Sequence, residues 1–277
     1  MSVARQSSLT RPAMLYAGNG LKKPPRVVWT PADLLAALIA TVVVAAPILG
    51  LGAVGERLLL GKQVAPGTAA GLFAAVVALA IPYAALFWCT VLFTVGKYGL
   101  PWGMLRFRPA RRNVYLAMVP LAVGLNVATG CLAWGLGLLT NRGGEVVNAQ
   151  SAALLASFPG SWAGFVACLF IVAVAAPVAE ETYFRGMLYG LLRERYGAWP
   201  AIGASALIFA AAHLFVFGQY LLVALPQLFV LGLVLALVVE RTRSLYPAIL
   251  LHSLNNSLVV VALFWGVAAG GGAPLGA

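Results

Sequence analysis

Residues 177–186 read Pro-Val-Ala-Glu-Glu-Thr-Tyr-Phe-Arg-Gly and place Glu180 and Glu181 side by side after the almost wholly apolar run 158–178. A charged group at membrane depth is costly, and such groups usually mark a functional site with a nearby partner. Neighbouring side chains on a helix point about 100° apart, so the two carboxylates face different surroundings. Glu181 lies four residues before Arg185, the favourable order for an ion pair within one helix. This spacing predicts a structural role for Glu181 and Arg185 and leaves Glu180 available for chemistry.

The composition of the chain is that of a polytopic membrane protein rather than a soluble domain. Of its 277 residues, 62% are hydrophobic and 9% are charged, and several apolar runs reach the ~20 residues that a helix needs to cross a bilayer. The formal net charge of +11 comes largely from clusters beside these runs, which indicates membrane topology and argues against nucleic-acid binding. Three cysteines stand alone inside apolar runs and are expected to be small buried residues without a disulfide or metal role: Cys89, Cys131 and Cys168.

We expect an all-α transmembrane helical bundle of about seven spans, with the N-terminus in the cytoplasm. The chain divides into a basic cytoplasmic tail at 1–30, a single membrane domain at 31–268 and a flexible C-terminal end at 269–277. The expected spans are roughly 33–55, 68–95, 114–139, 162–195, 198–216, 220–239 and 246–268.

The distribution of arginine and lysine decides how the middle of the chain is read. The stretch 97–112 carries five basic residues and no acidic one, which marks it as cytoplasmic, and its aromatic and proline content predicts an interfacial segment. Residues 162–195 fit either two crossings or one long tilted helix, kinked at Pro177. We predict one helix, because this reading puts four further arginines on the cytoplasmic side: Arg193, Arg195, Arg241 and Arg243.

The chain contains only two histidines, His213 and His252, and both lie in expected spans. Phe209 precedes His213 by one helical turn, and Asn256 follows His252 by one turn. Taken singly, an imidazole or carboxamide in a span often only forms a hydrogen bond between helices. Polar groups in lipid turn inward to satisfy one another, so these residues and the two glutamates are expected to share one cluster.

Such a cluster has the chemical groups that hydrolysis of an amide requires. A carboxylate and an imidazole can activate water, and an imidazole and a carboxamide can donate to a developing oxyanion. The Gly-x-Ser-x-Gly and His-Glu-x-x-His patterns of other hydrolases are absent from the sequence. Glu180, His213 and His252 could also hold a zinc ion with an open position, and the spacing leaves that alternative open.

Three ordered motifs carry a resemblance to a known family: Glu180-Glu-x-x-x-Arg185, Phe209-x-x-x-His213 and His252-x-x-x-Asn256. Over about 162–260 the chain resembles the CPBP family, the CAAX proteases and bacteriocin-processing enzymes also called Abi proteins. The resemblance implies an intramembrane endopeptidase with a catalytic core at about 160–260. It implies that Glu180 activates the water and that His213 helps to position or deprotonate it. It further implies that His252 and Asn256 stabilise the oxyanion, while Glu181, Arg185 and Phe209 support the site.

The leading hypothesis is therefore an endopeptidase that cuts a membrane-associated peptide or protein, in a bacterial inner membrane and without nucleic acid. No cofactor is required by this reading, although the family has been described both as metalloproteases and as glutamate-type proteases. Asn256 is a poor zinc ligand and a better oxyanion donor, which favours the second description. Two alternatives from other classes are a proton-coupled transporter and a non-catalytic membrane protein, such as a bacteriocin immunity protein or a scaffold. Paired repeats and broken helices would favour the transporter, and the sequence shows neither.

Overall fold

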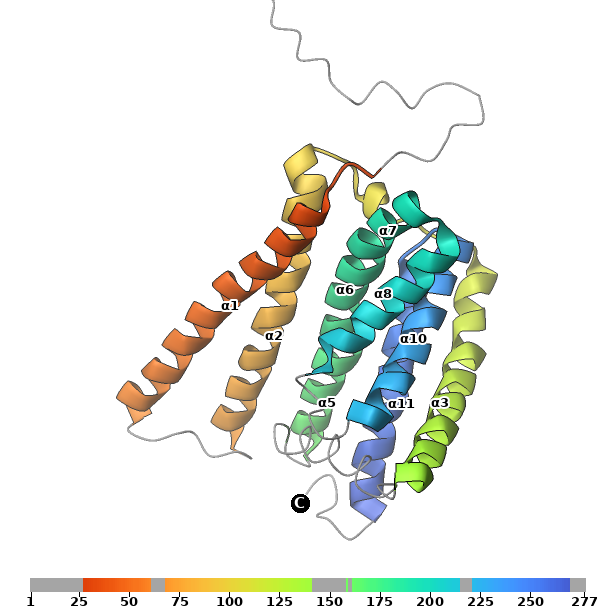
Figure 1. Ribbon diagram of the computed structural model, residues 1–277. Coiled ribbons are helices and arrows are strands. Elements are labelled where there is room, and N and C mark those ends of the chain that lie inside the picture. The colour runs from red at the N-terminus through yellow and green to blue at the C-terminus, as the bar shows by residue number, and fades with distance from the viewer. Residues whose placement is uncertain (1–26, 61–67, 141–157, 159–160, 215–220, 270–277) are drawn as a thin grey trace, which may run out of the picture.

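The computed structural model describes residues 27–60, 68–140, 158, 161–214 and 221–269, and these residues form helices and short connections without a strand (Figure 1). The expected tail at 1–30 and the expected end at 269–277 lie almost wholly outside the described residues. The elements are α1 (Pro31–Leu60), α2 (Ala69–Val91), the π-helix η2 (Leu92–Gly96), the 3₁₀-helix η3 (Trp102–Leu105), α3 (Arg112–Thr140), α5 (Trp162–Phe170), the π-helix η4 (Ile171–Ala175), α6 (Ala176–Glu181), the π-helix η5 (Thr182–Leu188), α7 (Tyr189–Tyr196), α8 (Ala198–Ala212), α10 (Leu221–Thr242) and α11 (Tyr246–Ala269).

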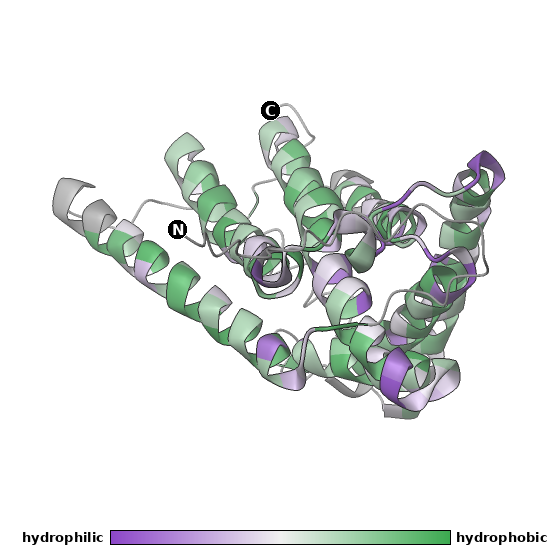
Figure 2. Cartoon of the chain, turned by 90° about the horizontal axis from the view of Figure 1, so that it is seen from above, coloured by the Kyte–Doolittle hydropathy of each residue, from purple (hydrophilic) through white to green (hydrophobic). Residues whose placement is uncertain are grey.

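Within the described ranges, six helices are long and apolar enough to cross a membrane, and hydrophobic residues predominate along them (Figure 2). α8 is apolar but has only 15 residues, so it is about 22 Å long and shorter than the ~30 Å hydrocarbon core. The fifth expected span, 198–216, thus corresponds over its described part to a helix shorter than a full crossing. The six helices of spanning length are Pro31–Val54, Ala69–Gly96, Arg112–Thr140, Trp162–Tyr196, Ala224–Thr242 and Tyr246–Trp265.

The long helix expected at 162–195 is present as one helical run of 35 residues, Trp162–Tyr196. Its backbone departs from α-helical geometry twice, in η4 before α6 and in η5 after it. Pro177 stands at the start of α6 and cannot donate a backbone hydrogen bond, and π-turns are a known way for a helix to absorb such an interruption. The two glutamates therefore occupy the end of a short α-helical piece between two π segments.

The basic segments gather at one end of the bundle, where Figure 1 shows the start of α1, the α7–α8 turn and the α10–α11 turn (top of the view). Arg193 Nε lies 2.6 Å from Glu240 Oε2, which joins the end of α7 to the end of α10. Arg106 O accepts a 2.9 Å hydrogen bond from Leu245 N, which joins the loop after η3 to the start of α11. This arrangement agrees with the grouping of arginines that the sequence indicated; the cytoplasmic orientation of this end stays a prediction.

Two details of burial differ from the sequence-based expectations. Cys131 is exposed on α3, whereas Cys89 and Cys168 are buried, because its side of α3 faces outward from the bundle. The segment η3 was expected at the membrane interface, yet Leu105 within it is fully buried in the main core. Gly186 provides the space for this approach, since a Cβ there would lie 3.2 Å from the Leu105 side chain.

Gly232 sets the distance between α8 and α10. A Cβ at this position would lie 3.0 Å from both Cα and Cβ of Ala206, so small residues allow the close contact of the two helices. We expect Gly232→Ala to destabilise the protein by about 1–3 kcal/mol, because the helices must separate or strain. Unfolding in detergent measures the change. Gly203→Ala on α8 is the matched control, since its Cβ would meet nothing within 4 Å; equal stability of both variants would contradict the prediction.

Candidate functional site

Glu180 and Glu181 end α6 inside the bundle and differ in what they contact. Glu181 is fully buried, and its Oε1 lies 2.8 Å from Nη1 of Arg185, so the ion pair expected from the spacing is present. Nη2 of the same guanidinium donates to Gly232 O at 3.1 Å, which ties the pair to α10. Glu180 retains 9% exposure, and its carboxylate receives no hydrogen bond from the residues that the structure describes; His252 Nε2 lies 3.9 Å from its Oε2.

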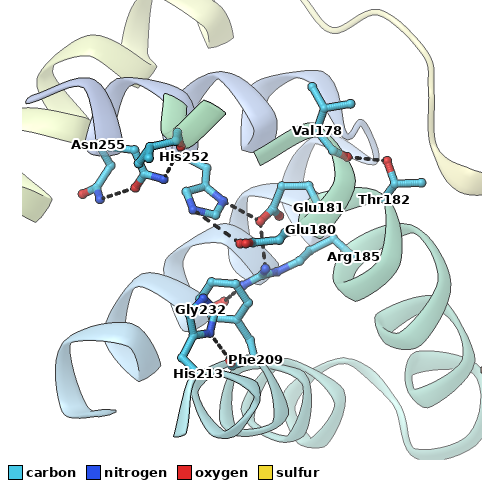
Figure 3. A network of polar contacts seen from close by, with 12 residues as sticks. Val178, Glu180, Glu181, Thr182, Arg185, Phe209, His213, Gly232, His252 and Asn255 are labelled. Atoms are coloured by element: carbon cyan, nitrogen blue, oxygen red, sulfur yellow. Dashed lines mark hydrogen bonds and ion pairs between the residues drawn. The ribbon is translucent and has the colours of Figure 1, made fainter. Parts of the chain in front are cut away.

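His252 on α11 contacts both glutamates, as Figure 3 shows. Its Nδ1 lies 3.0 Å from Glu181 Oε1, and a carboxylate oxygen accepts, so Nδ1 carries the hydrogen. Its Nε2 then faces Glu180, with Oε2 at 3.9 Å. The sequence indicated only Arg185 as the partner of Glu181; the structure adds that the same Oε1 also orients the imidazole of His252.

Phe209 on α8 packs among the charged groups. Its ring lies beneath the Arg185 guanidinium, with Cζ 4.4 Å from the ring centroid, a distance at which a cation is attracted to the aromatic face. The same ring makes edge contacts with His213 at 4.9 Å and with His252 at 5.9 Å between centroids. Phe209 is fully buried and packs between η5, the end of α8 and α11.

His213 follows the last residue of α8 and is half-buried. Its Nδ1 lies 2.8 Å from the carbonyl oxygen of Phe209. Because a carbonyl only accepts, Nδ1 carries the hydrogen and Nε2 of the neutral ring presents a lone pair. His252 Nε2 lies 3.9 Å from Glu180 Oε2, and the Phe209 ring contacts both imidazoles, so the two histidines lie on either side of one aromatic ring close to the glutamates.

Asn256 lies one turn beyond His252 and is held by other partners. Its Nδ2 donates to Val172 O in η4 at 2.9 Å, and its Oδ1 accepts from Asn255 Nδ2 at 3.3 Å. Asn126 on α3 in turn donates to Asn255 Oδ1 at 2.8 Å. Six of the seven expected site residues thus lie in one contact network, and Asn256 borders it through the π segment that precedes the glutamates.

Some side chains near the site were not identified from the sequence. Asn126 lies in an expected span, where a polar group is itself a signal, and it reaches the site through Asn255. Arg106 was counted only as a topological charge, yet its Nη1 donates to Arg185 O at 3.1 Å. No spacing in the sequence connects 106 with 185, so the contact is visible only in the fold.

The donor set does not fit a metal ion. Among the residues that the structure describes, no three His, Cys, Asp or Glu side chains are arranged to hold one. His252 uses Nδ1 for Glu181 and its Nε2 stands 3.9 Å from Glu180, so the alternative zinc site of Glu180, His213 and His252 is not assembled.

Residues 162–258 match the family model described as type II CAAX prenyl endopeptidase Rce1-like. This segment is similar to the CAAX proteases. It contains every candidate site residue, from Glu180 to Asn256, and confirms the resemblance found in the three motifs. The remaining described helices, α1 to α3, lie outside the CAAX protease match.

One curated relative matches part of the chain. The chain is 37% identical over 87 residues to an uncharacterized 24.3 kDa protein of Escherichia coli. The match covers 30% of this chain and 38% of that protein, so it spans less than half of either. No solved structure matches the chain significantly.

Proposed function

We propose that this protein is an intramembrane endopeptidase that hydrolyses a peptide bond of a membrane-associated peptide or protein, in a bacterial inner membrane. One observation carries the proposal: His252 lies between two adjacent buried carboxylates, with Nδ1 on Glu181 and Nε2 facing Glu180. A structural ion pair needs only one carboxylate. The second one, without a hydrogen bond from the described residues, has the properties of a general base.

In this proposal, Glu180 and His213 activate the attacking water together. The carboxylate accepts one proton of the water, and Nε2 of His213 accepts a hydrogen bond from the other O–H. The water oxygen forms a bond to the carbonyl carbon, the C–N bond breaks, and the proton held by Glu180 passes to the leaving amine. The products are a carboxylic acid and an amine, so the site is restored without any other reactant.

His252 and Asn256 are the proposed donors to the oxyanion. With both ring nitrogens protonated, His252 donates Nδ1–H to Glu181 and keeps Nε2–H for the developing charge. Asn256 donates one amide N–H to Val172 O, and the proposal assigns its other N–H to the oxyanion. Arg185, Glu181 and Phe209 hold these groups in place.

The test is a comparison of the membrane proteome with the wild-type protein and with Glu180→Gln, in a bacterial strain that lacks the native copy. New peptide N-termini are identified by mass spectrometry. We expect a small set of cleavage products that the Glu180→Gln strain does not make. Glu194→Gln, an exposed carboxylate on the same long helix, is the control and should give the wild-type set. Identical products in all three strains would refute proteolysis and favour a non-catalytic role.

A further inference from the structure

The backbone of η5, just after the two glutamates, accepts hydrogen bonds from residues that precede the segment matching the family. η5 is a π-helix, and π-helical turns leave main-chain carbonyls available to other donors. Three consecutive carbonyls of η5 are satisfied by side chains from the N-terminal part of the chain. Arg106 Nη1 donates to Arg185 O at 3.1 Å and to Gly186 O at 3.4 Å, and Trp29 Nε1 donates to Met187 O at 3.0 Å.

Glycines allow Arg106 to approach this closely. A Cβ at Gly190 would lie 3.1 Å from Arg106 Nη1, and a Cβ at Gly186 would lie 3.2 Å from Leu105 Cδ2. The backbone of Arg106 is fixed as well, because it adopts a left-handed conformation with φ of 65° and its carbonyl accepts from Leu245 N. Both the backbone and the side chain of Arg106 are therefore held in place by the fold.

Membrane topology alone does not explain this placement. An arginine that only sets the orientation of the helices in the membrane can remain exposed, as Arg108, Arg111 and Arg112 do. Arg106 instead lies over the Tyr189 ring, with Cζ 5.4 Å from the centroid. Burial lowers the pKa of Arg106 to about 10, so the guanidinium remains a cation at neutral pH. Arg106 is half-buried, and a cation on neutral carbonyls gives stronger hydrogen bonds than a neutral donor would.

The contact leads directly to the candidate site. Arg185 accepts from Arg106 through its carbonyl, while its side chain holds Glu181 Oε1, and that oxygen orients His252. We propose that Arg106, assisted by Trp29, is a positioning residue that holds the η5 backbone so that Glu181 directs His252 toward Glu180. The effect on catalysis rests on the proposed endopeptidase function; the effect on His252 does not.

The two histidines make a direct test possible, because a protein labelled with ¹⁵N-histidine shows only two imidazoles. Ring ¹⁵N chemical shifts report which nitrogen carries the hydrogen and how strongly it is bonded, and His213→Gln assigns the signals. We expect Arg106→Gln to shift the His252 Nδ1 signal and to leave that of His213, which is bonded to Phe209 O within its own helix end, in place. Arg106→Lys, which keeps a charged donor, should restore part of the shift.

Two further variants complete the design. Trp29→Phe keeps the aromatic ring but removes the hydrogen bond to Met187 O, and a smaller shift of His252 is expected. This variant also keeps the test open should Arg106→Gln fail to fold. Arg108→Gln is the control, since Arg108 is exposed and its side chain donates to Gly103 O rather than to η5. Unchanged His252 signals in both Arg106→Gln and Trp29→Phe would overturn the proposal.

Kinetics separate this inference from the proposed function. On a cleaved peptide, Arg106→Gln should lower kcat by up to about 100-fold with little change in KM, because misplacement of a reacting group affects the chemical step. Wild-type kcat in a folded Arg106→Gln protein would overturn the positioning role while leaving proteolysis intact. Absence of any Glu180-dependent cleavage would overturn the proposed function, and the shift of His252 would still test the contact.

Discussion

Glu180→Gln is expected to lower the rate of peptide cleavage by about 10²–10⁴-fold, the contribution that a positioned general base typically makes. Glutamine has nearly the same size and keeps an acceptor oxygen, but it cannot take the proton of the water. The measurement is kcat on a peptide identified from the membrane proteome, with the purified protein in detergent or liposomes. Stability should change little, because no described residue donates a hydrogen bond to the Glu180 carboxylate.

The adjacent carboxylate provides the contrast for this prediction. Glu181→Gln alters a fully buried group that accepts from both Arg185 and His252, so it should reduce stability as well as activity. A Glu180→Gln protein that cleaves at the wild-type rate would remove this residue from the chemistry. Equal losses of stability in the two variants would show that both glutamates act mainly in folding.

Sequence spacing and charge distribution predicted two features of the fold correctly: an ion pair within one helix and the length of one membrane helix. The ion pair Glu181–Arg185 was predicted because the two residues are one helical turn apart. The single long helix was predicted by counting the arginines on each side of the membrane. The length of α8 was not predictable in this way, because hydropathy continues past Ala212 while the helix ends there. Burial of Leu105 within η3 was also not predicted, because the basic and aromatic residues around it are typical of an interfacial segment and do not show which side chain a neighbouring helix covers.

The candidate site was predicted as a set of residues but not as a set of contacts. Helical-face arguments assume 3.6 residues per turn, and the π segments η4 and η5 change the direction of side chains on each side of α6. Carbonyls in these segments become acceptors for Asn256 and Arg106, which no periodicity indicates. The contact of His252 with Glu181 is likewise tertiary, since 71 residues separate them.

Arg185→Gln is expected to destabilise the protein by about 3–5 kcal/mol, the cost of breaking a buried ion pair by removing one partner. The variant leaves Glu181 charged and fully buried, with Oε2 already without a partner among the described residues. It also removes the donor to Gly232 O and the cation over the Phe209 ring. Unfolding in detergent, followed by tryptophan fluorescence, measures the loss. Arg195→Gln on the same helix is the exposed control and should stay within about 0.5 kcal/mol of the wild type.

The geometry of Arg185 also predicts what a conservative replacement does. Arg185→Lys keeps the charge, but one ammonium group cannot reproduce the planar fork that reaches Glu181 and Gly232 O while lying on Phe209. It should therefore recover only part of the stability. Replacing both partners, as Glu181→Gln with Arg185→Met, removes the unpaired charge and should be less destabilising than Arg185→Gln alone. If the double variant is instead the least stable, the pair contributes more to the free energy of unfolding than the neutralisation of two buried charges. The hydrogen bond to Glu181 that orients His252 would then explain why the two charges lie in the core of the bundle.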